Sequence, residues 1–278
     1  MNMNAMLDDL AKRSEKLKDT DDYIGPDGLV WCGKCHTPKQ TRVEFMGKTR
    51  TPYCLCKCMA EKRDAEDAAW RRQQELDRVR RMRRTGFPDA EMARWTFERD
   101  DHQNEHLSTV ARKYVDNFSE MRRRGKGLLL FGSVGTGKTF MAACIANALI
   151  DQGHPCLVTN FSRLTNTISG MYSGKQEYID GLDSFELLVI DDLASERDTE
   201  YMQETVTSII DARYRSGKPL IITTNLTTHE LQSPNDMRKQ RIYSRLFEMC
   251  VPVEARGQDR RKQRLKGEYE EMADLLGL

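Results

Sequence analysis

The sequence lacks several features that mark whole classes of protein. It has no apolar run approaching the roughly 18 residues that a membrane-spanning helix requires, so no contact with a membrane is expected. Asp8 and Asp9 lie where a signal peptide would carry its apolar stretch. Charge of one sign is also missing, because 44 lysines and arginines nearly balance 43 aspartates and glutamates. A globally basic nucleic-acid binder is thereby excluded, and we expect a cytoplasmic protein in which any nucleic-acid site is a local patch.

The cysteines do not form the pattern of a disulfide framework. Such frameworks belong to short secreted chains, whereas this chain has 278 residues, a length typical of about two domains. Five of the eight cysteines lie between positions 32 and 58, while Cys144, Cys156 and Cys250 are isolated in apolar surroundings. The isolated cysteines are expected in the core, and the cluster indicates a metal site.

Four parts follow one another along the chain. Met3, Met6, Leu7 and Leu10 form one apolar helical face too short to be stable alone. Residues 23–59 contain Gly, Pro and the clustered cysteines. Residues 60–84 contain neither Pro nor Gly and are rich in helix formers. We predict a helical or disordered segment (1–22), a small cysteine-containing domain (23–59), a charged helical linker (60–84) and a larger domain (85–278).

The last part has the alternation of an α/β fold. Short β-prone runs are separated by longer helix-like segments, as expected for a parallel sheet with crossover helices. These runs lie at 127–131, 155–159, 185–190 and 219–224. No internal repeat interrupts the alternation.

A phosphate-binding loop follows the first of these runs. The residues are Gly132, Ser133, Val134, Gly135, Thr136, Gly137, Lys138 and Thr139, and the helix-like sequence FMAACIANALI comes next. Glycines let successive N–H groups face the phosphates, and the helix N-terminus adds positive potential. Lys138 is expected to reach the β- and γ-phosphates and Thr139 to ligate Mg²⁺. The sequence therefore predicts a site for a nucleoside triphosphate.

Polar residues end two further apolar runs. Asp191 and Asp192 follow Leu187–Ile190, and we expect Asp191 to hold Mg²⁺ through water and Asp192 to orient or activate the attacking water. A buried strand that ends in two turn-forming aspartates is the alternative. Asn225 follows the run at 220–224 and can bond the water or the γ-phosphate. Arg241 and Arg245, four residues apart on one helix face, are surface charge or reach a neighbouring subunit's γ-phosphate.

The cysteine cluster has the spacing of a zinc site. Cys32-x-x-Cys35 is separated by 18 residues from Cys54, Cys56 and Cys58. Four thiolates suit a tetrahedral structural Zn²⁺, which would stabilise a piece too small to build its own core. Five cysteines compete for four places, and His36 is a further candidate. Redox chemistry or free structural cysteines are the alternatives.

These motifs together resemble the AAA+ ATPases of the DnaC/DnaI helicase-loader group, with the IstB transposition helpers close by. The resemblance covers about residues 85–265 and rests on GSVGTGKT, LLVIDDL, LIITTN and RIYSRL, with a weaker match at TGFP and WTF. It implies a P-loop AAA+ core with a five-stranded parallel sheet, helices on both faces and a truncated lid.

The resemblance also implies roles for individual residues. Arg245 looks like the arginine finger, with Arg241 as its companion. GQDRR resembles the terminal G-x-D-x-R, which implies that Arg261 is the sensor arginine, with Arg260 as the other candidate. The zinc ligands implied by DnaI-type loaders are Cys32, Cys35, Cys56 and Cys58, with Cys54 as the alternate. Asp192 replaces the glutamate of many relatives, so hydrolysis is expected to be slow or helped by Glu196.

The leading interpretation is an ATPase that loads a hexameric replicative helicase onto single-stranded DNA. Its cofactors would be ATP, Mg²⁺ and Zn²⁺, the zinc piece would hold the helicase, and the ATPase domain would self-associate. An IstB-like transposition helper on duplex DNA and a nucleotide-gated adaptor with little hydrolysis are the alternatives. Candidate contacts to DNA phosphates are the arginines of 71–84 and two basic clusters, Arg122, Arg123, Arg124, Lys126 and Arg256, Arg260, Arg261, Lys262, Arg264, unless each is a solvated face.

Overall fold

The computed structural model describes residues 19–45, 47–193, 200–234 and 236–260, together with isolated positions between 262 and 276. The apolar pattern of the first ten residues falls outside the described residues, as do Glu196, Arg261 and Arg264.

The chain divides into two compact units, of which the first ends at Leu76 and the second begins at Asp77. Helix α2 (Lys57–Gly86) continues through this boundary, and its 30 residues include the stretch expected to be a charged helical linker. No glycine or proline interrupts α2 before Gly86, so the backbone hydrogen bonding continues throughout. The proposed limits of the four parts stay a prediction.

The first unit contains two short antiparallel strand pairs, β1 with β2 and β3 with β4. The strands are β1 (Tyr23–Ile24), β2 (Val30–Trp31), β3 (Val43–Phe45) and β4 (Lys48–Arg50). Within its described residues the buried hydrophobic side chains are few, namely Leu29, Val30, Cys32 and Cys56. Lys39 and Asp22 form an ion pair of 2.8 Å whose side chains are both 2% exposed. So little apolar burial is typical of small domains that depend on a metal or another cross-link.

The second unit is built on a five-stranded parallel sheet in the order β6-β7-β8-β5-β9. The strands are β5 (Gly127–Phe131), β6 (Cys156–Asn160), β7 (Leu187–Leu193), β8 (Leu220–Thr224) and β9 (Cys250–Glu254). The predicted fold class is confirmed. Strand β9 was not marked by its sequence, because Pro252 interrupts it; an edge strand tolerates the missing N–H, and β9 pairs only with β5.

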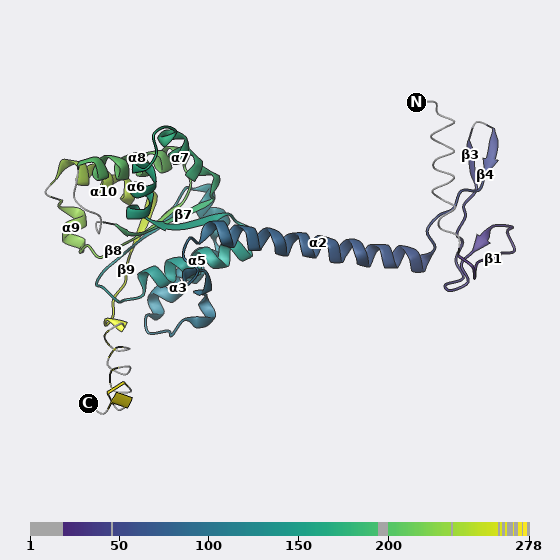
Figure 1. The fold of residues 1–278 in the computed structure, drawn as a ribbon, viewed down its shortest axis with the longest axis horizontal. Coiled ribbons are helices and arrows are strands. Elements are labelled where there is room, and N and C mark those ends of the chain that lie inside the picture. The colour runs from purple at the N-terminus through teal and green to yellow at the C-terminus, as the bar shows by residue number, and fades with distance from the viewer. Residues whose placement is uncertain are drawn as a thin grey trace. The chain divides into compact units, whose positions relative to one another are not determined.

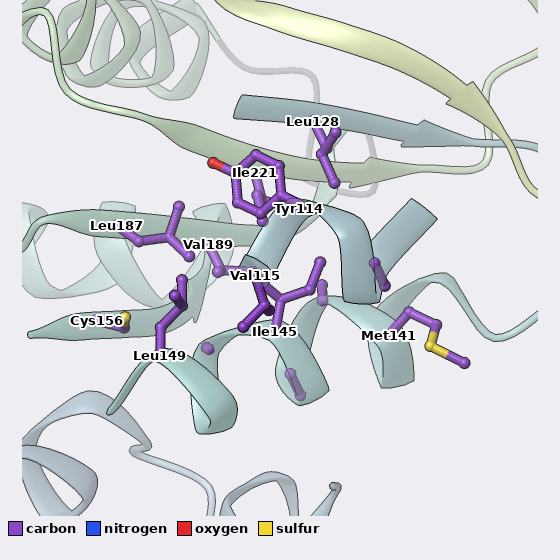
Figure 2. Close-up of a cluster of buried hydrophobic side chains, with 14 of the residues drawn as sticks. Tyr114, Val115, Leu128, Met141, Ile145, Leu149, Cys156, Leu187, Val189 and Ile221 are labelled. Atoms are coloured by element: carbon purple, nitrogen blue, oxygen red, sulfur yellow. The ribbon is translucent and has the colours of Figure 1, made fainter. Parts of the chain in front are cut away.

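Helices cover both faces of this sheet (Figure 1). One face carries α3 (Glu105–Asp116) and α5 (Lys138–Asp151), and the other carries α6 (Phe161–Ser169), α8 (Glu200–Ser216) and α10 (Met237–Met249). Figure 2 shows Val115 of α3 beside Ile145 of α5, and Tyr114 of α3 near Ile221 of β8. Helix α5 packs against α3 as well as against β6, β7 and β8, so it is apolar nearly all round.

Shorter elements complete the second unit. They are η1 (Met92–Arg94), η2 (Phe97–Arg99), α4 (Phe118–Arg123), α7 (Lys175–Gly181), η3 (Leu182–Ser184) and α9 (Thr228–Gln232). None of the described helices is both long enough and apolar enough to cross a lipid bilayer.

The end of α2 is anchored to the second unit. Val79 and Met82 pack against the core cluster that contains α3 and α5. Arg78 donates to the Gly153 carbonyl at 3.2 Å, and Arg83 pairs with Asp151 at 2.5 Å. Two arginines of the predicted phosphate-contacting stripe are therefore engaged with the protein itself.

Arg213 connects α8 to the two chain segments that precede β7 and β8. Its side chain is fully buried, and its guanidinium donates to the carbonyls of Phe185, Glu186 and Pro219 at 2.8 to 3.2 Å. Asp183 lies 3.5 Å away. Burial lowers the pKa of Arg213 to about 10, which still leaves it charged at neutral pH. These carbonyls precede β7 and β8, so Arg213 sets where both strands begin.

Replacing Arg213 by methionine should therefore destabilise the second unit by about 3 kcal/mol, since several buried carbonyls lose their donors. Urea unfolding followed by circular dichroism measures this change. Arg215→Met is the matched control, because Arg215 lies on the exposed side of the same helix. Equal unfolding midpoints for the two variants would contradict the anchoring role.

Candidate nucleotide site and cysteine cluster

A cavity of about 330 Å³ opens at the carboxyl edge of the sheet. The loop between β5 and α5 forms one wall, where Val134–Thr139 line the cavity. Asp191 and Asp192, in the last residues of β7, and Asn225, which follows β8, form another. The phosphate loop, the end of β7 and the residue after β8, which the sequence proposed as parts of one site, therefore lie together at this edge of the parallel sheet.

The loop has the backbone conformation that phosphate binding requires. Gly135 and Gly137 have φ angles of 79° and 91°, in the left-handed region that favours glycine. Gly137 is the N-cap of α5, so the first N–H groups of that helix, which have no partner within the helix, lie beside the loop that lines the cavity. A side chain at Gly135 would collide with Asp259, whose carboxylate lies against the loop.

Lys138 is buried and held in place by three acceptors. Its Nζ donates to the carbonyls of Gly132 and Ser133 at 2.9 and 2.7 Å, and to Asn225 Oδ1 at 2.9 Å. The first two residues of the predicted loop therefore orient the lysine, and Asn225 connects it to β8. Phosphate oxygens are the acceptors to which such an ammonium group can turn.

Asp191 and Thr139 are arranged as a pair of oxygen ligands. The Thr139 hydroxyl donates to Asp191 Oδ1 at 2.7 Å, and the Thr223 hydroxyl donates to the same oxygen at 2.5 Å. Burial raises the pKa of Asp191, while these two hydrogen bonds oppose the rise. The Thr139 hydroxyl and the Asp191 carboxylate are oxygen donors of the kind that Mg²⁺ prefers, and they lie close enough together to hold one ion, Thr139 directly and Asp191 through water.

Asp192 adopts a backbone conformation that sequence patterns do not reveal. Its φ is 61°, and the pairing of β7 with β8 shifts register between Ile190 and Leu193. The backbone N–H of Asp192 donates to the Thr223 hydroxyl at 2.9 Å, and Asn225 Nδ2 donates to Asp192 Oδ1 at 3.1 Å. The bulge turns the Asp192 carboxylate toward Asn225 rather than along the strand.

Residues before α3, whose place at the site was not predicted from the sequence, complete the cavity. Trp95, Arg99 and Asp101 line it, and Asn147 of α5 donates to the carbonyls of Met92 and Trp95 at 3.0 and 2.9 Å. Trp95 belongs to the WTF motif, and this motif could have indicated that the residue lies at the site. Nothing in the sequence pairs Asp101 with a partner.

The predicted arginines lie in two different places. Arg241 and Arg245 are on α10, and both approach Asp211 of α8: Arg241 lies 3.8 Å from this carboxylate and Arg245 forms an ion pair with it. The guanidinium of Arg245 also lies 5.7 Å from the centre of the Tyr214 ring. Arg260 lines the nucleotide cavity, whereas Arg261 lies outside the described residues.

Much of the basic side-chain charge proposed for DNA is paired within the protein. Arg122 binds Glu186 at 2.9 Å, and Arg123 and Arg124 share Glu120 at 2.7 and 2.5 Å. Lys126 donates to the Glu248 carbonyl. In the second cluster, Arg256 pairs with Glu254 at 2.7 Å. For the first cluster these ion pairs favour the alternative of a solvated charged face over a contact to DNA phosphates.

Four cysteines come together in the first unit. The sulfurs of Cys32, Cys35, Cys56 and Cys58 all lie within 4.8 Å of one another. Cys58 Sγ is 3.7 Å from Cys32 Sγ and 3.4 Å from Cys56 Sγ, too long for disulfides. Tetrahedral zinc with bonds of about 2.3 Å places ligand sulfurs about 3.8 Å apart. Cys54 Sγ instead contacts the Pro38 carbonyl at 3.8 Å, outside the cluster.

The surroundings of the cluster favour the thiolate at Cys32 and Cys35 and the thiol at Cys56 and Cys58. The Thr37 hydroxyl lowers the pKa of Cys35 to about 5, and backbone N–H groups of Cys35 and Lys34 lower the pKa of Cys32. Burial raises the pKa of Cys56, and bonding to the neighbouring cysteines raises that of Cys58 to about 12. A divalent cation would let all four ionise together. Thr37 also accepts from Lys57 N–H at 3.0 Å, which joins the two cysteine pairs.

Comparison with known proteins finds similarity to proteins named as replicative helicase loaders. The replicative helicase loader DnaI of Bacillus subtilis (strain 168) is 23% identical over 150 residues, which are 50% of this chain and 48% of that protein. The replicative helicase loader DnaC of Escherichia coli (strain K12) is 27% identical over 125 residues, which are 44% of this chain and 50% of that protein. The chain thus spans about half the length of these curated relatives.

Solved structures share the fold. A crystal structure of DnaI matches with a TM-score of 0.52 and 23% identity, and covers 61% of this chain and 95% of its own. A crystal structure of the DnaC helicase loader matches with a TM-score of 0.51 and 23% identity, and covers 60% of this chain and 99% of its own. The predicted core of the DnaC/DnaI type is confirmed at the level of fold.

The family model for "IstB-like ATP binding protein" matches residues 57–267, well over half of the chain. This single match includes the phosphate loop, both aspartates, Asn225 and the two arginines of α10. The chain therefore belongs to the family of IstB-like ATP binding proteins.

Proposed function

We propose that this protein hydrolyses ATP at the cavity of the second unit and uses the ATP cycle to load a hexameric replicative helicase onto single-stranded DNA. The observation that carries the proposal is the hydrogen-bonded set of Lys138, Asn225 and Asp192 beside Thr139 and Asp191. This set supplies a cation that can bind phosphate, a carboxylate that can accept a proton from the attacking water, and two oxygen groups that can hold a metal ion at one edge of the sheet.

The chemistry follows from these positions. Thr139 and Asp191 would hold Mg²⁺, which neutralises charge on the β- and γ-phosphates when it is bound. Lys138 contacts the phosphate oxygens, and the Asp192 carboxylate, oriented by Asn225, accepts a proton from the attacking water. The new P–O bond forms as the bond to the bridging oxygen breaks, which leaves ADP and inorganic phosphate.

The loader role rests on similarity together with the first unit. The relatives named above as helicase loaders match the ATPase core, and the four-thiolate cluster gives the first unit a rigid surface on which a helicase can dock. Zn²⁺ would be structural there, because four sulfurs leave no open position for a substrate. The family description favours one other candidate, an IstB-like transposition helper that binds duplex DNA.

Substitutions at Lys138 and Asp192 separate ATP binding from hydrolysis. Lys138→Ala should weaken ATP binding by about 100-fold, because the charge-assisted contacts to phosphate disappear. Asp192→Asn should leave the affinity within about threefold but lower turnover about 100-fold. Asparagine tolerates the left-handed backbone and keeps Oδ1 for Asn225, so only the charge is lost. Titration with a fluorescent ATP analogue and phosphate-release assays measure both quantities. Undiminished turnover in Asp192→Asn would assign water activation to another residue.

Mixing two inactive variants tests whether Arg245 acts on a neighbouring subunit. Arg245→Ala and Lys138→Ala should each lack ATPase activity alone. In an equal mixture, about a quarter of the interfaces combine an intact phosphate loop with an intact Arg245, so activity should return to about that fraction. In a parallel mixture Arg241→Ala replaces Arg245→Ala, which tests whether Arg241 also acts on the neighbouring site. Absence of recovery in the first mixture would confine Arg245 to its ion pair with Asp211.

Co-elution with the replicative helicase of the source organism tests the loader role. The full chain and the helicase should share a high-mass peak on a sizing column in the presence of ATP. Cys56→Ser should lose both bound zinc and the shared peak, whereas Cys54→Ser should keep about one zinc per chain and the complex, because Cys54 lies outside the cluster. Zinc is measured by elemental analysis of the same fractions. With no complex in the wild type, binding of duplex DNA and of a transposase becomes the expected function.

A further inference from the structure

Arg260 enters the nucleotide cavity from the chain segment that follows β9, and an acid from a distant segment holds it. Arg260 Nη1 lies 2.7 Å from Asp101 Oδ1, and both residues line the cavity. The Arg260 side chain is 18% exposed and that of Asp101 is 43% exposed. The ion pair therefore sits at the mouth of the cavity, with the guanidinium on its inner side.

The carboxylate of Asp101 is fixed by its own turn. Asp101 Oδ1 also accepts the backbone N–H of Gln103 at 3.1 Å. Asn104, which directly follows Gln103, is buried and accepts the N–H of Leu107 at the start of α3. Asp101 is thus a preorganised acceptor on a turn anchored to α3, rather than a mobile surface acid.

The same turn braces the segment that carries Arg260. Asn104 Nδ2 donates to the Arg256 carbonyl at 2.8 Å. On the opposite side, the backbone N–H groups of Ala255 and Arg260 donate to the carbonyls of Phe131 and Gly135 at 2.8 and 3.1 Å. The segment 255–260 is therefore held between the turn and the phosphate loop.

One nitrogen of Arg260 remains for a ligand. Nη2 is buried and has no hydrogen-bond partner among the described residues. The guanidinium lies against Gly137, since a side-chain carbon added at that glycine would be only 3.1 to 3.3 Å from the guanidinium atoms. A buried guanidinium nitrogen without an acceptor is costly, and a phosphate oxygen in the cavity would satisfy it.

We propose that Asp101 is a positioning residue for nucleotide binding, which holds Arg260 over the phosphate loop so that its second nitrogen meets the triphosphate chain. The inference rests on the proposed nucleotide site and adds a residue to it. Asp101 acts through Arg260: it occupies Nη1, prevents the side chain from turning into solvent, and leaves Nη2 directed at the loop. Ordering the arginine beforehand removes a cost that ATP would otherwise have to meet on binding.

The test is a double-mutant cycle on the affinity for a non-hydrolysable ATP analogue with Mg²⁺. Asp101→Asn keeps Oδ1 for the Gln103 N–H and removes only the charge. We expect Asp101→Asn and Arg260→Gln each to weaken binding about tenfold, and the double variant to lose about tenfold rather than the hundredfold of independent effects. Arg260→Lys, which keeps the charge but cannot bond both Asp101 and phosphate in a fixed fork, should lie between the wild type and Arg260→Gln.

Asp116→Asn is the matched control, because Asp116 is exposed at the far end of α3 and its loss changes the net charge equally. Thermal unfolding of each variant confirms that the fold is kept. A hundredfold loss in the double variant, unchanged affinity in Asp101→Asn, or tighter binding in that variant would each overturn the proposal. Failure of the wild type itself to bind the analogue would refute the nucleotide site, and is thereby distinguished.

Discussion

One carboxylate oxygen of Asp191 accepts hydroxyl hydrogen bonds from Thr139 and Thr223, and this contact joins the three elements on which the candidate site is built. Thr139 begins α5, Asp191 lies in β7 and Thr223 lies in β8, the strand between β7 and β5. Burial raises the pKa of Asp191, so the two hydroxyls stabilise a charge that the site otherwise disfavours. The same Thr223 hydroxyl accepts the N–H of Asp192 and so fixes the bulge that aims the second acid.

The parts that sequence predicted are those whose determinants are contiguous. The phosphate loop needs a strand, glycines at left-handed positions, a lysine and a helix start, all within about a dozen residues. Asp191 and Asn225 were identifiable because parallel strands place their carboxyl ends together, so the ends of apolar runs indicate the site. Four of the five strands appeared as apolar runs, whereas β9 did not, since Pro252 and the exposed Val251 remove the continuous pattern.

The features that sequence missed depend on contacts between distant residues. Asp101 and Arg260 are far apart in the sequence of the second unit and meet only in its folded state, and Arg213 contacts its carbonyls only after β7 and β8 are placed. The left-handed Asp192 follows from the register shift between β7 and β8, which no local pattern encodes. The basic cluster before β5 looked available for DNA because Glu186, which pairs with Arg122, lies some sixty residues away in the chain.

Both arginines proposed for contact with phosphate are held by carboxylates of their own chain. Arg260 shares a partly exposed Asp101, so it can keep that partner while Nη2 binds a phosphate. Arg245 pairs with Asp211, whose side chain is only 17% exposed. If Arg245 turns to a neighbouring nucleotide, the largely buried Asp211 carboxylate keeps only Arg241, 3.8 Å away, as a cationic partner, which is costly. Only a strong counter-charge such as a triphosphate can offset that loss, so subunit contact through Arg245 should depend on bound nucleotide far more than contact through an exposed arginine would.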